Sequence, residues 1–178
     1  MQIQIDKLKS ATRRIEFSEQ ASEFPELTVL VEQGRVEFLD LISGQLEAVR
    51  AGDAIDISGS LATTVVVDCS RCLAKVTCPL ELQVSLSYVS TKGGDNEEIV
   101  DEVELDRDEL GQIPFSEDTI DLVDDIAQEI VMALPQQPLC SEGCLGLCPS
   151  CGCDLNNHTC DCEPPLLHPG LAALKDFK

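Results

Sequence analysis

Apolar and polar residues alternate along two stretches in the first half of the chain. From residue 55 to residue 67 most odd-numbered positions are apolar, whereas most even-numbered positions are Asp, Ser or Thr. Beyond this stretch the parity reverses, and the even-numbered positions from 76 to 88 are apolar. Because successive side chains of a strand point to opposite faces of a sheet, this period predicts two half-buried antiparallel strands. We expect them to form a long hairpin with Cys69 and Cys72 at its tip.

One later stretch has a helical period instead. Between residues 119 and 134, apolar side chains recur every three or four positions, as in a helix with one buried face. Asp118 or Asp121 can cap the first turn, and Pro135 prevents the helix from continuing. The sequence therefore predicts one main helix in the second half of the chain.

The remaining strands and the fold class follow from these elements. Residues 26–53 predict two or three further strands, which break at Gly34 and Gly44. The whole pattern favours an α+β fold with an antiparallel sheet or a partly open β-barrel. We expect residues 1–139 to form an antiparallel β domain with an acidic loop and the helix. Residues 140–178 are then a cysteine-rich zinc-binding segment and tail.

Acidic residues greatly outnumber basic ones. The 178 residues include 33 Asp and Glu against 12 Lys and Arg, which gives a formal net charge of −21. Residues 93–139 alone carry 15 acidic groups and one basic group. This stretch is either a solvated loop and helix face or a docking surface for a basic protein. A large surface for nucleic-acid phosphates is disfavoured, because affinity for phosphates comes from Lys and Arg.

The chain shows neither a membrane segment nor an export signal. No apolar run approaches the roughly 18 residues that a membrane helix needs. The first ten residues, MQIQIDKLKS, lack a basic patch followed by an apolar stretch. We therefore expect a soluble, cytoplasmic protein.

Cysteine is the most informative residue type. The chain has ten cysteines and two histidines, and in a reducing cytosol clustered cysteines are more often metal ligands than disulfides. Cys148-Pro-Ser-Cys151-Gly152 has the form of a zinc knuckle, in which a positive φ at the glycine lets N–H groups point at the sulfurs. Cys160 and Cys162 supply a second pair of thiols after a short loop. These four cysteines make one predicted zinc site.

A second predicted site joins segments that are far apart in the sequence. The hairpin tip contributes Cys69 and Cys72, and the segment after the helix contributes Cys140 and Cys144. Joining them would tie the hairpin tip to the helix exit. Zinc binding of this kind contributes on the order of 10 kcal/mol to folding. We therefore expect one or two zinc ions with structural roles.

Four further thiols and imidazoles fall outside the two predicted sites. Cys78 lies on the apolar face of its strand, which indicates a small core residue. Cys153 is expected to be a spare thiol, although it can replace a neighbouring ligand. His158 is an alternative ligand, and His168 is expected to be a surface imidazole.

The cysteine spacings also resemble those of other kinds of site. Cys144, Cys148 and Cys151 match the spacing of radical enzymes that hold a [4Fe–4S] cluster, but residues 152–178 are too few for the barrel of such an enzyme. Iron in a smaller role stays open, because an all-thiolate site suits both metals. A redox pair at the hairpin tip is disfavoured, since its first thiol lies between strands and not at a helix N-terminus. Four-thiolate sites leave no open position for catalysis, so we expect no enzymatic activity.

Motifs from about residue 55 to the end occur in an order that resembles a known family. They are Cys69-Ser-Arg-Cys72-Leu73, Ala133-Leu134-Pro135, Cys140-x3-Cys144-x-Gly146-Leu147-Cys148-Pro149-x-Cys151-Gly152, Leu155-Asn156 and Leu171-Ala172-Ala173-Leu174-Lys175. This combination resembles the bacterial YceD family, the large ribosomal RNA subunit accumulation proteins. The N-terminal third matches only in its strand-like character.

The resemblance implies a cytoplasmic, non-enzymatic factor that supports accumulation of 23S ribosomal RNA during assembly of the large subunit. Relatives are often encoded beside a small ribosomal protein of that subunit, which hints at a shared pathway. We therefore expect an acidic zinc protein that engages a basic ribosomal protein, or nascent RNA with it, on the pre-ribosomal large subunit. One alternative is a direct RNA-binding module whose hairpin brings Arg71 and Lys75 to phosphate. Another is a thiol-based redox or zinc sensor.

Overall fold

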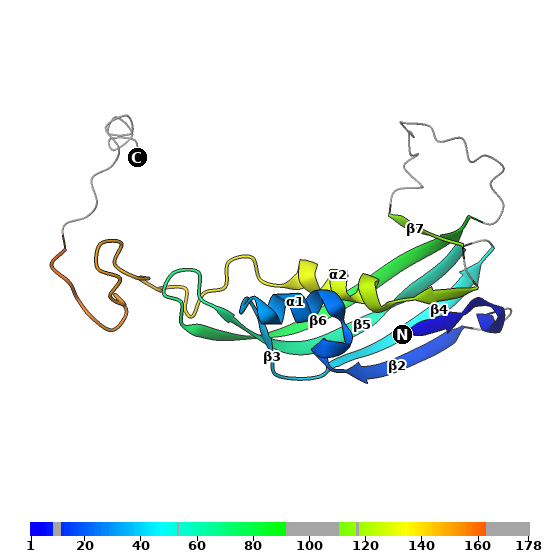
Figure 1. The fold of residues 1–178 in the computed structure, drawn as a ribbon, viewed down its shortest axis with the longest axis horizontal. Coiled ribbons are helices and arrows are strands. Elements are labelled where there is room, and N and C mark those ends of the chain that lie inside the picture. Colours follow the sequence, from blue (N-terminus) through cyan, green and yellow to red (C-terminus); the bar gives the residue numbers. More distant parts are fainter. Residues whose placement is uncertain (9–11, 53, 92–110, 117, 163–178) are drawn as a thin grey trace, which may run out of the picture. The chain divides into compact units, whose positions relative to one another are not determined.

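The computed structural model describes most of the chain (Figure 1). The described residues are 1–8, 12–52, 54–91, 111–116 and 118–162. Much of the predicted acidic loop, at 92–110, lies outside the described residues, as do His168 and the motif at 171–175.

The chain divides into two compact units. The sheet unit comprises residues 1–66 and 77–135, and the cysteine unit comprises residues 67–76 together with the described residues from 136 onward. The hairpin tip thus groups with the C-terminal cysteine segment.

Eight strands and two α-helices make up the regular structure of the described residues. The larger sheet contains β2 (Arg13–Glu19), β3 (Glu37–Phe38), β4 (Ile42–Ala51), β5 (Ala54–Asp68), β6 (Lys75–Ser90) and β7 (Gln112–Phe115). A smaller sheet pairs β1 (Gln2–Gln4) with β8 (Thr119–Asp121). The helices are α1 (Pro25–Glu32) and α2 (Val123–Ala133), and the 3-10 turns are η1 (Ile5–Leu8) and η2 (Ala21–Glu23).

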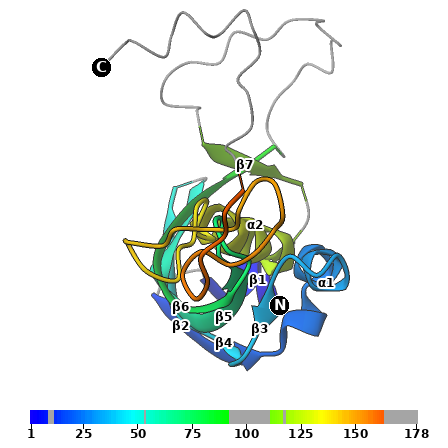
Figure 2. The same cartoon turned by 90° about the vertical axis from the view of Figure 1, so that its left-hand side faces the viewer.

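The larger sheet is open and mainly antiparallel. Its strand order is β2-β4-β5-β6-β7, with β3 beside β5. The pairs β2–β4, β3–β5 and β4–β5 are antiparallel, whereas the short β7 runs parallel to β6. Figure 2 shows β2, β4, β5 and β6 curving around α2 and β1. The predicted α+β fold with an antiparallel sheet is therefore confirmed.

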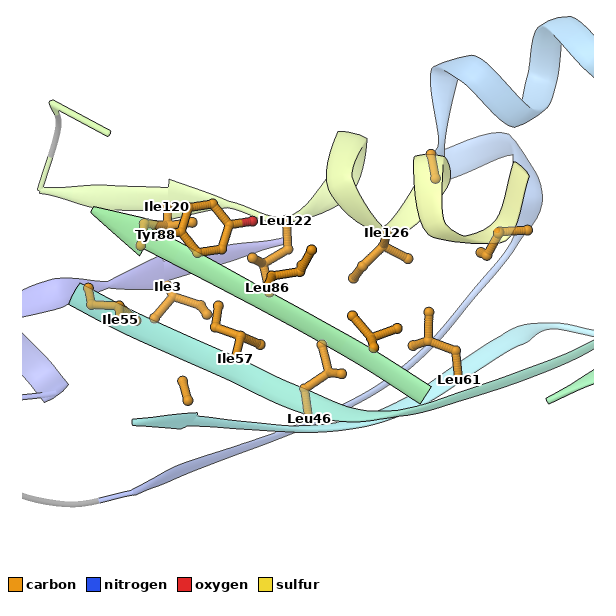
Figure 3. Packing of buried hydrophobic residues seen from close by; sticks show 14 of the residues in the cluster. Ile3, Leu46, Ile55, Ile57, Leu61, Leu86, Tyr88, Ile120, Leu122 and Ile126 are labelled. Atoms are coloured by element: carbon orange, nitrogen blue, oxygen red, sulfur yellow. The ribbon is translucent and has the colours of Figure 1, made fainter. Parts of the chain in front are cut away.

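The core of the sheet unit lies on the inner face of this sheet. Ile55 and Ile57 of β5 and Leu86 of β6 are buried there, in the alternation that predicted the hairpin. Leu122 and Ile126 cover them from the side of α2 (Figure 3). Burial of such apolar side chains contributes about 1.5–3 kcal/mol each, which makes this layer the main source of stability of the sheet unit.

The segment after residue 25 is a helix and not the predicted strand. Pro25 occupies the first helical position, where its fixed φ and missing N–H are well tolerated. Leu27 is fully buried and Leu30 packs against the core, a spacing of three residues that suits a helix. Gly34, with φ +67°, follows the helix end, and its N–H donates to the carbonyl of Val31. The prediction failed because the run Thr-Val-Leu-Val, with its three β-branched residues, has the composition of a strand.

The sequence predicted a strand break at Gly44, but this residue lies inside β4. It pairs with Phe17 of β2, and a Cβ added to it would lie 2.3 Å from the ring of Phe17 and 2.6 Å from Leu61. The glycine therefore provides space for an aromatic side chain on the neighbouring strand.

The predicted helix at 119–134 is shorter than expected. Thr119–Asp121 forms β8, and α2 begins at Val123 and ends before Pro135. Asp121 accepts a hydrogen bond from the backbone N–H of Val123 at 3.2 Å, so one of the two proposed acids does contact the first turn. Neither helix of the described residues has the length and apolar content needed to cross a membrane.

Candidate metal centres

Four cysteines from two distant segments converge in the cysteine unit. The Sγ atoms of Cys69, Cys72, Cys140 and Cys144 all lie within 4.8 Å of one another, and we call them the first thiol group. The Sγ atoms of Cys69 and Cys144 are 3.8 Å apart, and those of Cys72 and Cys140 are 3.5 Å apart. Four sulfurs around one zinc ion at 2.3 Å would be about 3.8 Å apart. The first thiol group therefore has the dimensions of a site for a single ion.

Most of the first thiol group is buried. Cys69, Cys72 and Cys144 are at most 9 % exposed and form an apolar cluster with Val76, Leu139 and Leu147, whereas Cys140 is exposed. All ten cysteines of the chain are free thiols. Four free thiols, three of them buried, are a donor set that suits a structural metal ion.

Four cysteines of the C-terminal segment form a second thiol group. The Sγ atoms of Cys148, Cys151, Cys153 and Cys160 lie within 4.8 Å of one another. The predicted set had Cys162 in place of Cys153. Cys162 lies beside this group, where its thiol is in hydrogen-bonding contact with Cys151 and Cys148. Five thiols therefore gather around the second candidate centre.

The two thiol groups begin with the same local backbone structure. In the hairpin tip, Cys69 donates its N–H to the carbonyl of Ala74 at 2.8 Å, and Leu73 donates to the carbonyl of Cys69 at 3.0 Å. In the C-terminal segment, Cys148 donates to Cys153 and Gly152 donates to Cys148, both at 2.8 Å. Each hydrogen bond of the hairpin tip spans the same number of residues as its counterpart in the C-terminal segment. Each Cys-x-x-Cys pair is therefore held by a knuckle of the same design.

Both knuckles need a left-handed residue after the second cysteine. Gly152 has φ +74°, as predicted, and Leu73 has φ +60° at the corresponding position. The left-handed region costs a residue with a Cβ about 1–2 kcal/mol, so Leu73 is the strained member of the pair. Its side chain is 63 % exposed, which means that core packing does not explain the choice. The conformation of this second knuckle was not predictable from the sequence, because no glycine marks it.

Backbone N–H groups favour the thiolate form of the first cysteine in each knuckle. The N–H of Arg71 is the main cause that lowers the pKa of Cys69 to about 6. In the second group, the N–H of Cys151 and then that of Ser150 lower the pKa of Cys148 to about 6. Both knuckles thus present a ready thiolate ligand at neutral pH.

The neighbouring thiols resist ionisation while no cation is bound. The N–H of Ala74 favours the thiolate of Cys72, but burial and hydrogen bonds with the other thiols, Cys140 first, raise its pKa to about 12. The hydrogen bond with Cys151, followed by burial, raises the pKa of Cys153 to about 12. Several thiolates in one small volume repel one another, and a divalent cation removes this repulsion.

Asn156 connects the C-terminal segment to the first thiol group. Its side-chain amide lies 3.5 Å from the Sγ of Cys144, and its Oδ1 accepts the N–H of Leu145 at 2.8 Å. The same amide group donates to Asp154 at 2.7 Å. A donor to a ligand sulfur fixes the orientation of that ligand. Asn156 appeared in the sequence motifs, but spacing alone gave it no role.

The cationic side chains of the hairpin have partners within the structure. Arg71 donates from its guanidinium to the carbonyl of Cys144 at 2.8 Å, and its own carbonyl accepts the N–H of Leu147 at 3.0 Å. Lys75 forms an ion pair with Asp68 at 2.8 Å. Arg71 therefore links the two segments that build the first thiol group.

Two other candidate residues belong to neither thiol group. Cys78 is half-buried on β6, on the side of that strand that carries Leu80. His158 is exposed, and its backbone N–H donates to Asp154. The residues present thus fit two metal ions held by sulfur alone.

Comparison with known proteins identifies the family that these motifs resemble. The family described as "Large ribosomal RNA subunit accumulation protein YceD" matches residues 57–178. Proteins of Mycobacterium bovis and Mycobacterium tuberculosis, described as uncharacterized, are 29 % identical over 127 residues, which is 71 % of this chain and 55 % of theirs. A Mycobacterium leprae protein, also described as uncharacterized, is 30 % identical over 133 residues, 71 % of this chain and 52 % of its own.

The chain thus spans about half the length of the curated relatives that it matches. No solved structure matches the chain.

Proposed function

The chain belongs to the YceD family of large ribosomal RNA subunit accumulation proteins, and we propose that it is a non-enzymatic zinc protein that supports accumulation of 23S ribosomal RNA in the cytoplasm. It acts during assembly of the large ribosomal subunit. The observation that carries this proposal is the convergence of four thiols from the hairpin tip and the segment after α2 within 4.8 Å. A bound ion at that point would hold together two segments of the family match.

The distances between the sulfurs favour a single ion over an iron–sulfur cluster. Ligand sulfurs 3.5 and 3.8 Å apart are close enough to contact one shared ion. A cluster places iron and sulfide atoms between its thiolates and so holds them farther apart. Zinc is the common structural ion for four thiolates, whereas a lone iron ion in the same site would give a coloured protein.

The ligand sets support a structural role. Within the described residues, both candidate groups consist of cysteine alone. Four thiolates complete the tetrahedral shell of zinc, whereas catalytic zinc keeps one position for water or substrate. We therefore propose that neither centre carries out a reaction.

Charge favours a basic protein as the partner. The chain has a net charge of −21, and each zinc ion bound by four thiolates adds a centre of net charge −2. Arg71 and Lys75 have partners within the structure, Cys144 and Asp68 respectively. The carboxylate of Asp68 offsets the charge of Lys75, and the carbonyl of Cys144 occupies a donor of Arg71 that would otherwise face phosphate. We propose that the chain engages a basic ribosomal protein of the pre-ribosomal large subunit, and contacts RNA through it.

A pull-down with and without ribonuclease tests the choice of partner. The tagged full chain is recovered from a cell extract, and its bound ribosomal proteins are identified by mass spectrometry. We expect a basic large-subunit protein to remain bound after RNA digestion. Complete loss of ribosomal proteins after digestion would favour the direct RNA-binding module instead. A Cys72→Ser variant should lose the interaction, whereas Cys78→Ser, which changes a thiol outside both groups, should keep it.

A further inference from the structure

The second candidate centre has one thiol more than a tetrahedral ion uses. Cys153 is in hydrogen-bonding contact with Cys151 and Cys160. Cys162 is in contact with Cys151 and Cys148. Cys153 also lies within 4.8 Å of the other three thiols of the second group, and the two thiols share one neighbour, Cys151.

The two candidate centres also differ in their exposure to solvent. In the first thiol group only Cys140 is exposed. Around the second centre, Cys151 and Cys162 are exposed, Cys153 and Cys160 are half-buried, and Cys148 alone is buried. Solvent and small molecules thus reach the ligands of the second centre more easily. An exposed centre also gives its side chains room to change position.

We propose that the second centre is an exchangeable zinc site in which Cys153 and Cys162 alternate as the fourth ligand. This inference rests on the zinc binding of the proposed function and adds to it a division of roles. The first thiol group, which contains four candidate ligands and no fifth thiol among the described residues, holds its ion permanently. The second centre exchanges its ion with the surroundings.

The exchange needs no oxidant and no reductant. The incoming thiol loses its proton and forms a Zn–S bond, and the outgoing thiolate leaves zinc and takes up a proton. The number of Zn–S bonds and the charge of the centre are the same before and after. Either ligand set leaves one thiol free beside the ion, where a zinc donor or acceptor can approach.

Zinc content of the full chain and its variants tests the redundancy of the two ligands. The single variants Cys153→Ser and Cys162→Ser should each keep about two zinc ions per chain, as the wild type does, because one ligand replaces the other. The double variant should keep about one. Cys78→Ser serves as the control, since it also removes a thiol but one outside both groups. A single variant that loses one ion would show a fixed ligand and overturn the inference.

Cadmium-113 NMR provides a second measurement that does not depend on stability. We expect the wild-type second centre to give a resonance broadened by ligand exchange, which becomes sharp in both single variants. A sharp resonance in the wild type would also overturn the inference. A full chain without zinc in either group would instead refute the proposed function, so the two failures are distinguishable.

Discussion

Gly152→Ala tests whether the left-handed backbone of the second knuckle contributes to metal affinity. Gly152 has φ +74°, and an added Cβ would meet no atom within 4 Å, so the substitution adds backbone strain and no clash. A residue with a Cβ in this region costs about 1–2 kcal/mol. The smaller freedom of alanine in the unfolded chain offsets about 0.4–1 kcal/mol of this cost. The net loss is about 1 kcal/mol, or about fivefold in the dissociation constant for zinc.

A competition titration against a chromogenic zinc chelator measures this loss. Only the weaker of the two binding steps should change, because the first thiol group does not contain Gly152. Gly143→Ala is the matched control, since Gly143 lies in the same unit, has no left-handed φ and also has open space around its Cβ position. Equal zinc affinities in the two variants would refute the idea that the knuckle conformation supports the ion.

Three further outcomes test separate parts of the structure. Asn156→Ala removes a donor to a ligand sulfur and should weaken zinc binding at the first thiol group about tenfold or more in the same titration. Gly44→Ala places a methyl group against the ring of Phe17 and should lower the free energy of unfolding by about 1–3 kcal/mol in urea, with unchanged zinc content. Burial and the hydrogen bond to Asp125 raise the pKa of Tyr88, the one tyrosine of the chain. Its phenolate absorbance should therefore appear only above its usual pKa of about 10, and the free energy of unfolding should fall as the pH rises past that value.

The hairpin was predictable because its signal is long and consistent. The alternation over β5 and β6 is too regular for a helix. Residues on one face of each strand are mostly buried or half-buried, so many positions support the same prediction. The helix α1 was not predictable in this way, because its β-branched residues favour a strand locally. Only the packing of Leu27 and Leu30 against the core decides in favour of a helix. Gly44 likewise depends on Phe17, a neighbour that sequence spacing does not reveal.

The candidate centres show the same division between local and tertiary information. Gly152 predicted the left-handed residue of one knuckle. The left-handed conformation of Leu73 in the other knuckle was not predictable, because a leucine in this conformation leaves no pattern in the sequence. The sequence predicted that thiols of the hairpin tip would meet those that follow α2, and the structure brings them within 4.8 Å. It could not decide between Cys153 and Cys162, because either spacing can reach one ion. Only the structure places Cys153 within 4.8 Å of the other three thiols and Cys162 in contact with two of them.

Metal analysis of the full chain, purified without added zinc, tests the central claim most directly. X-ray absorption at the zinc edge on the same sample reports the ligands of the bound ion. We expect about two zinc ions per chain, each surrounded by four sulfur atoms at about 2.3 Å. Less than one equivalent of any metal, or zinc surrounded mainly by oxygen and nitrogen, would contradict the account.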